Sequence, residues 1–331
     1  MSRRKSWVAR LDREAAARRK QLAAEARDAD KKADRAWAQR QVSAFEAQCD
    51  YLLSMHKECG PVWNWVEISQ RSPPNLPIPD HVNKEEARSA RDEYVPSLFD
   101  KLFLQVKRKK TQLEQNVAAG VRQDAASNQR RISDHQQQLE RYQWETRIAR
   151  GILQGSLPEY NEALEGICPF SELSEAQVSV TVPRLLPEAA TLVCFVDPSV
   201  LPKEEKKLNA SGKLNAKLIA PTTKWSLYEE FVAACALRVA REVFALLPLK
   251  RTVVNVAEKG IDLSTGQPAV LTLLAVSIER GVIEGFNFDT LQPVTCLRNL
   301  PSRMNFKKST GFEAVEAMTD EETFMTMSRA R

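Results

Sequence analysis

The sequence predicts an α+β protein, with an elongated N-terminal α-helical hairpin or coiled coil followed by a compact β-β-α-β-β-α domain. Residues 3–58 contain neither glycine nor proline, and they consist mostly of strong helix formers. Apolar residues recur at helical spacing again between residues 102 and 148, which predicts a second long helix. After residue 177 the apolar period changes to two, which is typical of strands.

Composition places the chain among ordinary globular proteins. It has 331 residues, of which 43% are hydrophobic and 27% charged, so a wholly disordered chain and a small disulfide-stapled fold are excluded. Only 11 glycines argue against a doubly wound nucleotide-binding fold, which needs glycine at its phosphate turns. No secretory signal and no apolar run of about 18 residues is present. The absence of such a run predicts no membrane partner. The six cysteines are scattered, so we expect reduced thiols and a cytoplasmic protein.

The first half of the chain divides into three segments. Residues 1–60 form a long basic helix, which Gly60 and Pro61 end. Residues 61–83 are rich in proline and tryptophan, and we expect an ordered connector there. Residues 84–157 form a second long helical segment, uninterrupted from about Ser97 to Leu153. Two long helices joined by a turn region most simply fold back as an antiparallel hairpin.

The second half predicts an α+β domain over residues 158–317 and a polar tail over 318–331. A lysine-rich stretch at 203–218 has no clear period and is interpreted as a loop. Apolar side chains cover most of the circumference of the helix near 225–247, so we expect burial on more than one side. The predicted strands and helices of this domain are, in order, residues 177–182, 191–196, 225–247, 251–257, 269–278 and 293–300.

The net charge of +5 conceals an uneven distribution. Residues 1–42 hold 13 basic and 6 acidic residues, and residues 101–150 hold 11 and 5, so the rest of the chain is acidic. Clustered cations favour a nucleic-acid contact, whereas interleaved acids favour a plain solvated helix face. The candidate nucleic-acid-binding residues are Lys107, Arg108, Lys109, Lys110, Arg18, Arg19 and Lys20.

A metal site and a nuclease site are the next possibilities. Cys49, His56 and Cys59 lie close in sequence, but a closed zinc site needs about four ligands, so we expect no metal. Asp197, Glu204 and Lys206 are the residue types that hold a divalent cation and position water. Asp197 is equally an ordinary turn residue, and the other two lie in the lysine-rich stretch.

The last candidate is a pair of arginines on the helix near 225–247. Arg238 and Arg241, with Glu242 beside them, form either a structural ion pair or an anion site, because a buried arginine needs a carboxylate partner. Walker, dinucleotide-binding and nucleophile-elbow motifs are absent from the sequence, and only three histidines occur. We therefore expect no cofactor, and enzymatic activity is uncertain.

The sequence contains the stretches HKECGPVWNW, SPPNLP, VPSLFDKLF, YEEFVAACALRVAREVFALLP, LSTGQPAVLTLLAVSIER, FNFDTLQP and MNFKKSTGFEAVE. These stretches resemble an uncharacterised bacterial family of cytosolic coiled-coil proteins with an α+β C-terminal domain. The similarity covers most of residues 45–317, and its C-terminal part is similar to tails of some restriction-endonuclease-like proteins. The resemblance implies no activity, only a DNA-associated or defence role, and the catalytic motif of the nuclease portion is missing.

Together these observations favour a non-enzymatic interaction or scaffold protein that uses a helical hairpin to self-associate or to dock a protein partner. Long helices with uneven apolar stripes are the basis for that expectation. A nucleic-acid-binding module is the alternative, and a metal-dependent nuclease is the third possibility.

Overall fold

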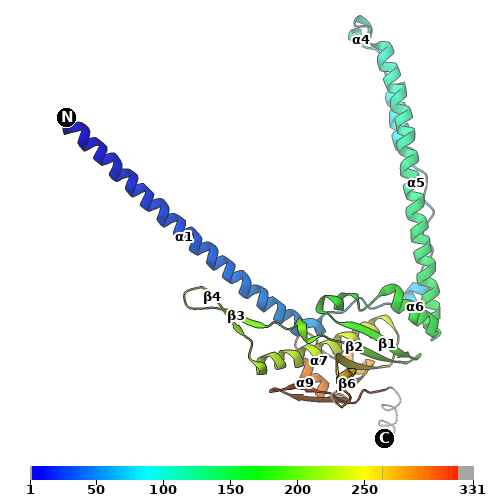
Figure 1. Ribbon diagram of the computed structural model, residues 1–331. Helices are drawn as coiled ribbons and strands as arrows, with labels where there is room; N and C mark the ends of the chain where they lie inside the picture. Colours follow the sequence, from blue (N-terminus) through cyan, green and yellow to red (C-terminus); the bar gives the residue numbers. More distant parts are fainter. Residues whose placement is uncertain (1, 263, 320–331) are drawn as a thin grey trace. The chain divides into compact units, whose positions relative to one another are not determined.

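The computed structural model describes residues 2–262 and 264–319, with side chains from residue 17 onward. The chain forms two compact units, one of residues 1–63 with 163–331 and the other of residues 64–162. Each unit is described by itself (Figure 1). The α+β class is confirmed, since the chain combines long helices with a C-terminal mixed sheet.

The larger unit is built on a mixed sheet in the order β1-β2-β5-β6-β7-β8. Strands β2 and β5 pair in parallel, and the other neighbours pair antiparallel. Strand β2 and the first half of β5 are almost wholly buried, as a continuous apolar run predicts. The strands are β1 (Ser179–Leu185), β2 (Ala189–Phe195), β5 (Arg251–Ile261), β6 (Pro268–Glu279), β7 (Ser302–Lys307) and β8 (Gly311–Glu313).

Helix α7 (Pro221–Leu246) connects the two parallel strands and packs on the sheet. Pro221 occupies its first turn, where a missing N–H costs nothing. Helix α7 contacts strands β2, β5, β6 and β8, helix α9 (Pro293–Arg298) and the end of α1. From Tyr228 to Leu246 nearly every α7 side chain is buried, because different elements cover different sides of the helix.

The simple β-β-α-β-β-α order is incomplete, because two hairpins are added to it. The lysine-rich stretch expected as a loop forms β3 (Glu204–Leu208) and β4 (Leu214–Leu218), an antiparallel pair separate from the main sheet. Strands β7 and β8 form the second hairpin at the sheet edge. At the start of the predicted polar tail, the backbone of Met318 exchanges hydrogen bonds with the Asn255 side chain. Residues 320–331 lie outside the described part.

Helix α1 spans Ser2–Ser54, and a single 3₁₀ turn, η1 (Met55–Lys57), follows it. Its last third buries Ala38, Val42 and Leu52 against the larger unit. This is the part of the sequence in which apolar residues become dense, so sequence pattern and burial agree.

The smaller unit is a set of helices around α5. Its helices are α2 (Trp65–Ser69), α3 (Val82–Asp92), α4 (Leu98–Leu102), α5 (Val106–Leu153) and the start of α6 (Leu157–Ile167). Buried Asp124 of α5 accepts hydrogen bonds from the backbone N–H groups of Asn83 and Lys84, which satisfies the free donors at the start of α3. A Cβ on Gly120 would lie 2.6 Å from the Asn83 carbonyl oxygen, so glycine permits this close contact.

The helix expected to be continuous from Ser97 to Leu153 is broken between α4 and α5. Ser97 and Asp100 form a capping box at the start of α4. Leu104 then adopts a left-handed backbone with φ +53°, which ends the helix. Helical spacing alone does not reveal this break, because leucine is an ordinary helix former.

We predict that Gly311→Ala lowers the free energy of unfolding by about 3 kcal/mol. Gly311 has φ +87°, and a Cβ there would lie 2.8 Å from Cε3 of Trp225 on α7. Gly281→Ala is the matched control, because no atom lies within 4 Å of its Cβ position. Denaturant midpoints of both variants test the prediction, and equal midpoints would contradict it.

Candidate functional site

The 3₁₀ turn η1, which directly follows α1, is held by a cation on α7. Nη1 of Arg241 donates to the carbonyl oxygens of His56 at 2.6 Å, Lys57 at 2.8 Å and Glu58 at 3.2 Å. The same guanidinium lies 3.8 Å from the ring centroid of Phe288, a cation–π contact. A helix end leaves carbonyls without partners and carries partial negative charge, so one arginine satisfies both needs.

The next residue, Glu242, binds the chain just after this end. Both of its carboxylate oxygens accept from the Gly60 N–H, at 3.0 and 3.1 Å. Nε of Arg238 lies 2.6 Å from Oε1 of Glu242, and both side chains are buried. Burial raises the pKa of the Glu242 carboxyl, and the Arg238 guanidinium and the Gly60 N–H limit that rise. We call Arg238, Arg241 and Glu242 the α1 clamp.

The clamp answers the question that the sequence left open for these residues. Arg238 pairs with Glu242 and also with Glu172, whose Oε2 lies 3.0 Å from Nη2. Arg241 is occupied by backbone carbonyls. Arg238 is therefore in an ion pair, whereas Arg241 binds backbone carbonyls and has no carboxylate among its described partners.

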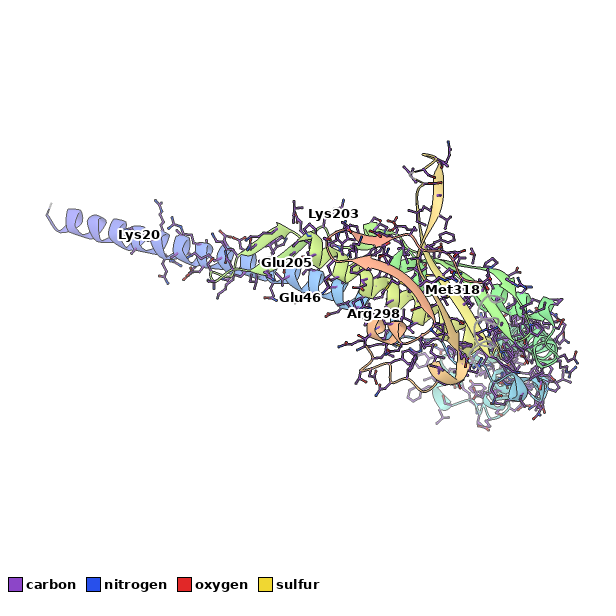
Figure 2. The ribbon with its side chains drawn as sticks, turned by 90° about the horizontal axis from the view of Figure 1, so that it is seen from below. Lys20, Glu46, Lys203, Glu205, Arg298 and Met318 are labelled. Atoms are coloured by element: carbon purple, nitrogen blue, oxygen red, sulfur yellow. The ribbon has the colours of Figure 1, made fainter. Side chains whose placement is uncertain are left out.

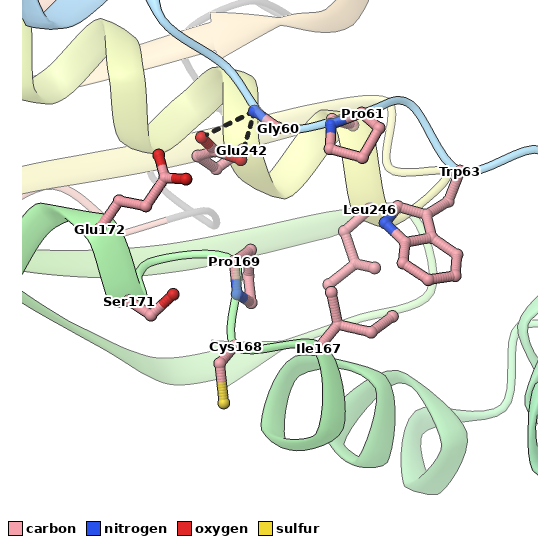
Figure 3. Close-up of a pocket in the computed structure, with 11 residues that line it drawn as sticks. Gly60, Pro61, Trp63, Ile167, Cys168, Pro169, Ser171, Glu172, Glu242 and Leu246 are labelled. Carbon is pink, nitrogen blue, oxygen red and sulfur yellow. Dashed lines mark hydrogen bonds between the residues drawn. The ribbon is translucent and has the colours of Figure 1, made fainter. Parts of the chain in front are cut away.

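A small hollow opens beside the clamp (Figure 3). Its volume is about 160 Å³, below the roughly 300 Å³ at which ligand pockets begin. Glu242 and Glu172 contribute carboxylates to its wall, and Trp63 and Leu246 contribute apolar surface. Both carboxylates already have partners within the chain, Arg238 for both and the Gly60 N–H for Glu242.

His56 lies at the same helix end and is 2% exposed. Among the described residues neither ring nitrogen has a hydrogen-bond partner of normal geometry. Burial, with Lys57 nearby, lowers the pKa of His56, so the neutral ring is favoured. Cys49 and Cys59 are half-buried, and within the described part of the chain no group of three or more histidine, cysteine or acidic side chains could hold a metal ion.

The β3–β4 hairpin contacts α1. Nζ of Lys206 donates to Oε1 of Gln41 at 3.0 Å, and just before the hairpin Gln48 donates to the Val200 carbonyl of η3 (Pro198–Val200) at 2.9 Å. At the hairpin turn, Gly212 lies against the Arg35 side chain. The hairpin therefore follows α1 as far as Arg35, and Lys203 and Glu205, at its base, are seen nearer Glu46 (Figure 2).

Beyond this contact α1 projects into solvent. Every described α1 side chain from Ala17 to Trp37 is exposed, and Lys20 lies far out on the free part of the helix (Figure 2). We call residues 17–37 the α1 arm. Arg18, Arg19 and Lys20 are all in it and are all exposed.

An open hollow lies where the arm meets the hairpin. Its volume is about 620 Å³, and Lys31, Arg35, Trp37 and Lys213 are among the side chains that line it. Trp37 is half exposed there, at 51%. Cations around an exposed aromatic ring can contact phosphate and stack on a base.

The nuclease candidates divide between two places. Asp197 follows β2 as the N-cap of the 3₁₀ turn Pro198–Val200 and accepts from the Ser199 N–H at 2.8 Å, in a hollow that Glu258 and Lys259 also line. Glu204 and Lys206 are on β3 and line a different hollow, against α1. The expectation that Glu204 and Lys206 lie in a loop is wrong. The Lys206 side chain is hydrogen-bonded to Gln41. The arrangement gives these three residues separate structural roles.

The basic cluster of the smaller unit lies at the start of α5. Lys107, Arg108 and Lys110 are exposed. Lys109 forms an ion pair with the buried carboxylate of Asp100, so it supports the local fold. Three of the four cations therefore face solvent, and only Lys109 pairs with Asp100.

Two functional features escaped the sequence analysis. The clamp depends on backbone carbonyls, which carry no residue signal, although Arg238 and Arg241 on a buried helix did indicate special partners. The hairpin has mixed polar residues on both faces, because α1 and solvent cover it in place of a sheet. A turn signal at Asn209–Gly212 was the only indication available.

We predict that Glu242→Gln lowers the free energy of unfolding by about 3 kcal/mol, because it leaves a buried arginine without its buried counterion. Glu172→Gln is the matched control on the same guanidinium. The Glu172 side chain is 79% exposed, and exposed pairs contribute at most about 1 kcal/mol. Chemical denaturation of both variants gives the comparison. Equal losses of unfolding free energy in the two variants would contradict the prediction, because the buried Arg238–Glu242 pair would then contribute no more than the exposed Arg238–Glu172 pair.

Comparison with known proteins adds no relative. No family model, curated protein or solved structure matches the chain. Among the residues that the structure describes, no helix combines the length and apolar character needed to cross a bilayer. The resemblance to bacterial coiled-coil proteins stays a prediction, and the functional inference depends on the geometry of the α1 clamp and the α1 arm.

Proposed function

We propose that the chain is a non-enzymatic interaction protein in which the α1 arm docks a second copy of the same chain. The observation that carries the proposal is the contrast along one helix. From Ala17 to Trp37 all described side chains are exposed, whereas from Ala38 onward α1 buries one face, at Ala38, Val42 and Leu52, against its own unit, and the turn that follows it is held by the clamp. A helix fixed at one end and free at the other presents a surface in a defined direction.

The arm has little to stabilise it alone. Its side-chain pairs are exposed, as in Gln21 with Glu25 and Lys31 with Asp28, and such pairs contribute only about 0.2–0.5 kcal/mol each. Most helical stability in proteins comes from packing of an apolar face. A partner that covers one face of the arm would supply that packing.

The free face of the arm suits a second copy. Leu22, Ala29, Ala33 and Ala36 follow a heptad-like spacing, and at 3.6 residues per turn they lie nearly opposite the face that buries Val42. That series therefore remains available while α1 is clamped. Acidic and basic residues alternate beside it, as in DADKKADR, so a second copy can pair charges of opposite sign.

We predict that Leu22→Glu with Ala29→Glu weakens self-association at least about tenfold, since two carboxylates would enter the apolar contact. Ala17→Glu with Ala24→Glu is the matched control. It makes the same change in charge on the same helix, on the far side from Leu22, where both alanines are exposed. Sedimentation velocity over a concentration series measures the dissociation constant of each full-length protein.

Three results decide the matter. Concentration-dependent association of the native chain, lost in the first variant and kept in the control, supports the proposal. A native chain that stays monomeric at all concentrations contradicts it. Equal loss in both variants would show that charge alone, and no particular face, controls association.

Nucleic-acid binding is the second candidate, and the β3–β4 hairpin favours it. The hairpin adds exposed lysines, including Lys213 and Lys217, beside a basic helix. Trp37 lies half exposed in the hollow between them, next to Arg35. This combination of cations and a stacking ring, on two elements distant in sequence, is what a single-stranded nucleic acid would contact.

For this candidate we predict that Arg35→Glu with Lys213→Glu lowers affinity for single-stranded DNA about tenfold and reduces the slope of log K against log salt by about 1–2. Lys259→Glu with Lys308→Glu is the control of equal charge, at exposed positions elsewhere in the larger unit. Fluorescence anisotropy at several salt concentrations gives both quantities. A salt-independent signal, or equal effects of the two variants, would remove the candidate.

A further inference from the structure

The segment around α4 exposes a continuous apolar surface at the end of the smaller unit. Figure 1 shows α4 at the end of the long helix α5. The exposed fractions run from 63% for Phe103 to 89% for Leu104. Exposed apolar clusters of this kind mark contact sites on proteins. The side chains, which we call the apolar tip, are Val95, Leu98, Phe99, Leu102, Phe103 and Leu104.

Helix α4 is oriented with its apolar face outward. Its one acidic residue, Asp100, is 5% exposed. That carboxylate accepts from the Tyr94 hydroxyl at 3.1 Å and the Ser97 N–H at 3.0 Å, and it pairs with Lys109. These three contacts of the Asp100 carboxylate hold the inner face of α4, so the opposite face, with Leu98, Phe99 and Phe103, is turned toward solvent.

Exposed cations lie on α4 and at the start of α5, close in sequence to the tip. Residues 94–110 hold five basic residues and one acidic residue, and that acid is the buried Asp100. Lys101, Lys107, Arg108 and Lys110 are exposed, and the nearest exposed acids, Asp92 and Glu93, precede the tip. A surface that covers the apolar side chains therefore meets an excess of positive charge.

We propose that the apolar tip inserts into the surface of an anionic lipid bilayer. Leucine and phenylalanine side chains enter the boundary between headgroups and acyl chains, and the nearby lysines and arginine contact anionic headgroups. A second copy docked tip to tip would bring two groups of positive charge together, which is unfavourable. Charge complementarity thus selects the lipid surface.

This is contact with one leaflet and not a membrane span. Helix α4 has five residues, far fewer than the roughly 20 needed to cross a bilayer. The proposal departs from the expectation of no membrane partner, which rested on the absence of a long apolar run. A short segment whose apolar face is turned outward can contact a membrane without a long apolar run in its sequence.

The test is co-sedimentation of the full chain with vesicles of phosphatidylcholine alone and of phosphatidylcholine with about one third phosphatidylserine. We expect binding to the anionic vesicles, weaker binding to the neutral ones and a decrease with added salt. Phe99→Ser with Phe103→Ser should reduce binding at least about tenfold. Leu76→Ser with Ile78→Ser is the matched control, because it removes two apolar side chains of similar exposure from the same unit.

A charge-reversed pair gives a second, independent measurement. Lys107→Glu with Lys110→Glu should lower binding to anionic vesicles at least about tenfold and leave the weak binding to neutral vesicles unchanged. Arg130→Glu with Arg150→Glu is its control, at exposed positions farther along α5. Lys109 is avoided, since its ion pair with Asp100 supports the fold.

The outcomes are distinct. Loss of binding in both tip variants, with both controls intact, supports the proposal. No binding of the native chain to anionic vesicles, or equal binding by the Phe99 and Phe103 variant, overturns it. Light scattering that shows a native oligomer converted to monomer by that variant also overturns it, because the tip would then be covered by a second copy.

Discussion

The contact on which the position of α1 depends is that of Arg241 with the carbonyl oxygens of η1 and Glu58, directly after α1. Three carbonyl oxygens converge on one guanidinium nitrogen, and the adjacent Glu242 takes the Gly60 N–H. Two neighbouring residues of α7, Arg241 and Glu242, thus bind the carbonyl oxygens and an N–H group of the segment that follows α1. The direction in which α1 leaves the domain is set by this pair, so the orientation of the α1 arm depends on α7.

Placing a charged network in a core has an energetic cost that apolar packing would avoid. Arg238 and Glu242 are almost fully buried, and such pairs stabilise less than well-packed apolar residues of similar volume. Their advantage is directional, because a guanidinium fork accepts few geometries. An apolar contact would hold the end of α1 with more freedom to rotate or slide. For a helix that projects from its domain, a fixed angle between helix and domain matters more than the additional unfolding free energy that apolar packing would give.

Sequence reasoning succeeded where periodicity and burial coincide, and failed where tertiary contacts decide. The strands β2, β5 and β6 and the buried helix α7 were predictable, because each has an apolar pattern of the right period. Strands β3 and β4 have no such pattern, since α1 supports them in place of a sheet. The break at Leu104 was invisible because a left-handed leucine carries no local signal. The pairing of Arg238 with Glu242 could be anticipated, but the carbonyl partners of Arg241 could not.

The apolar tip shows why composition alone misjudges a surface. LFDKLFL has the spacing of an amphipathic helix, for which the default expectation is an apolar face turned inward. Asp100 reverses that orientation. The side chain of Lys109 and the Ser97 N–H hold the pKa of Asp100 well below its usual range, so the carboxylate stays charged and its inward network stays intact at neutral pH. Because turning the apolar face inward would expose this network and break its hydrogen bonds, the outward orientation is a built property of the segment.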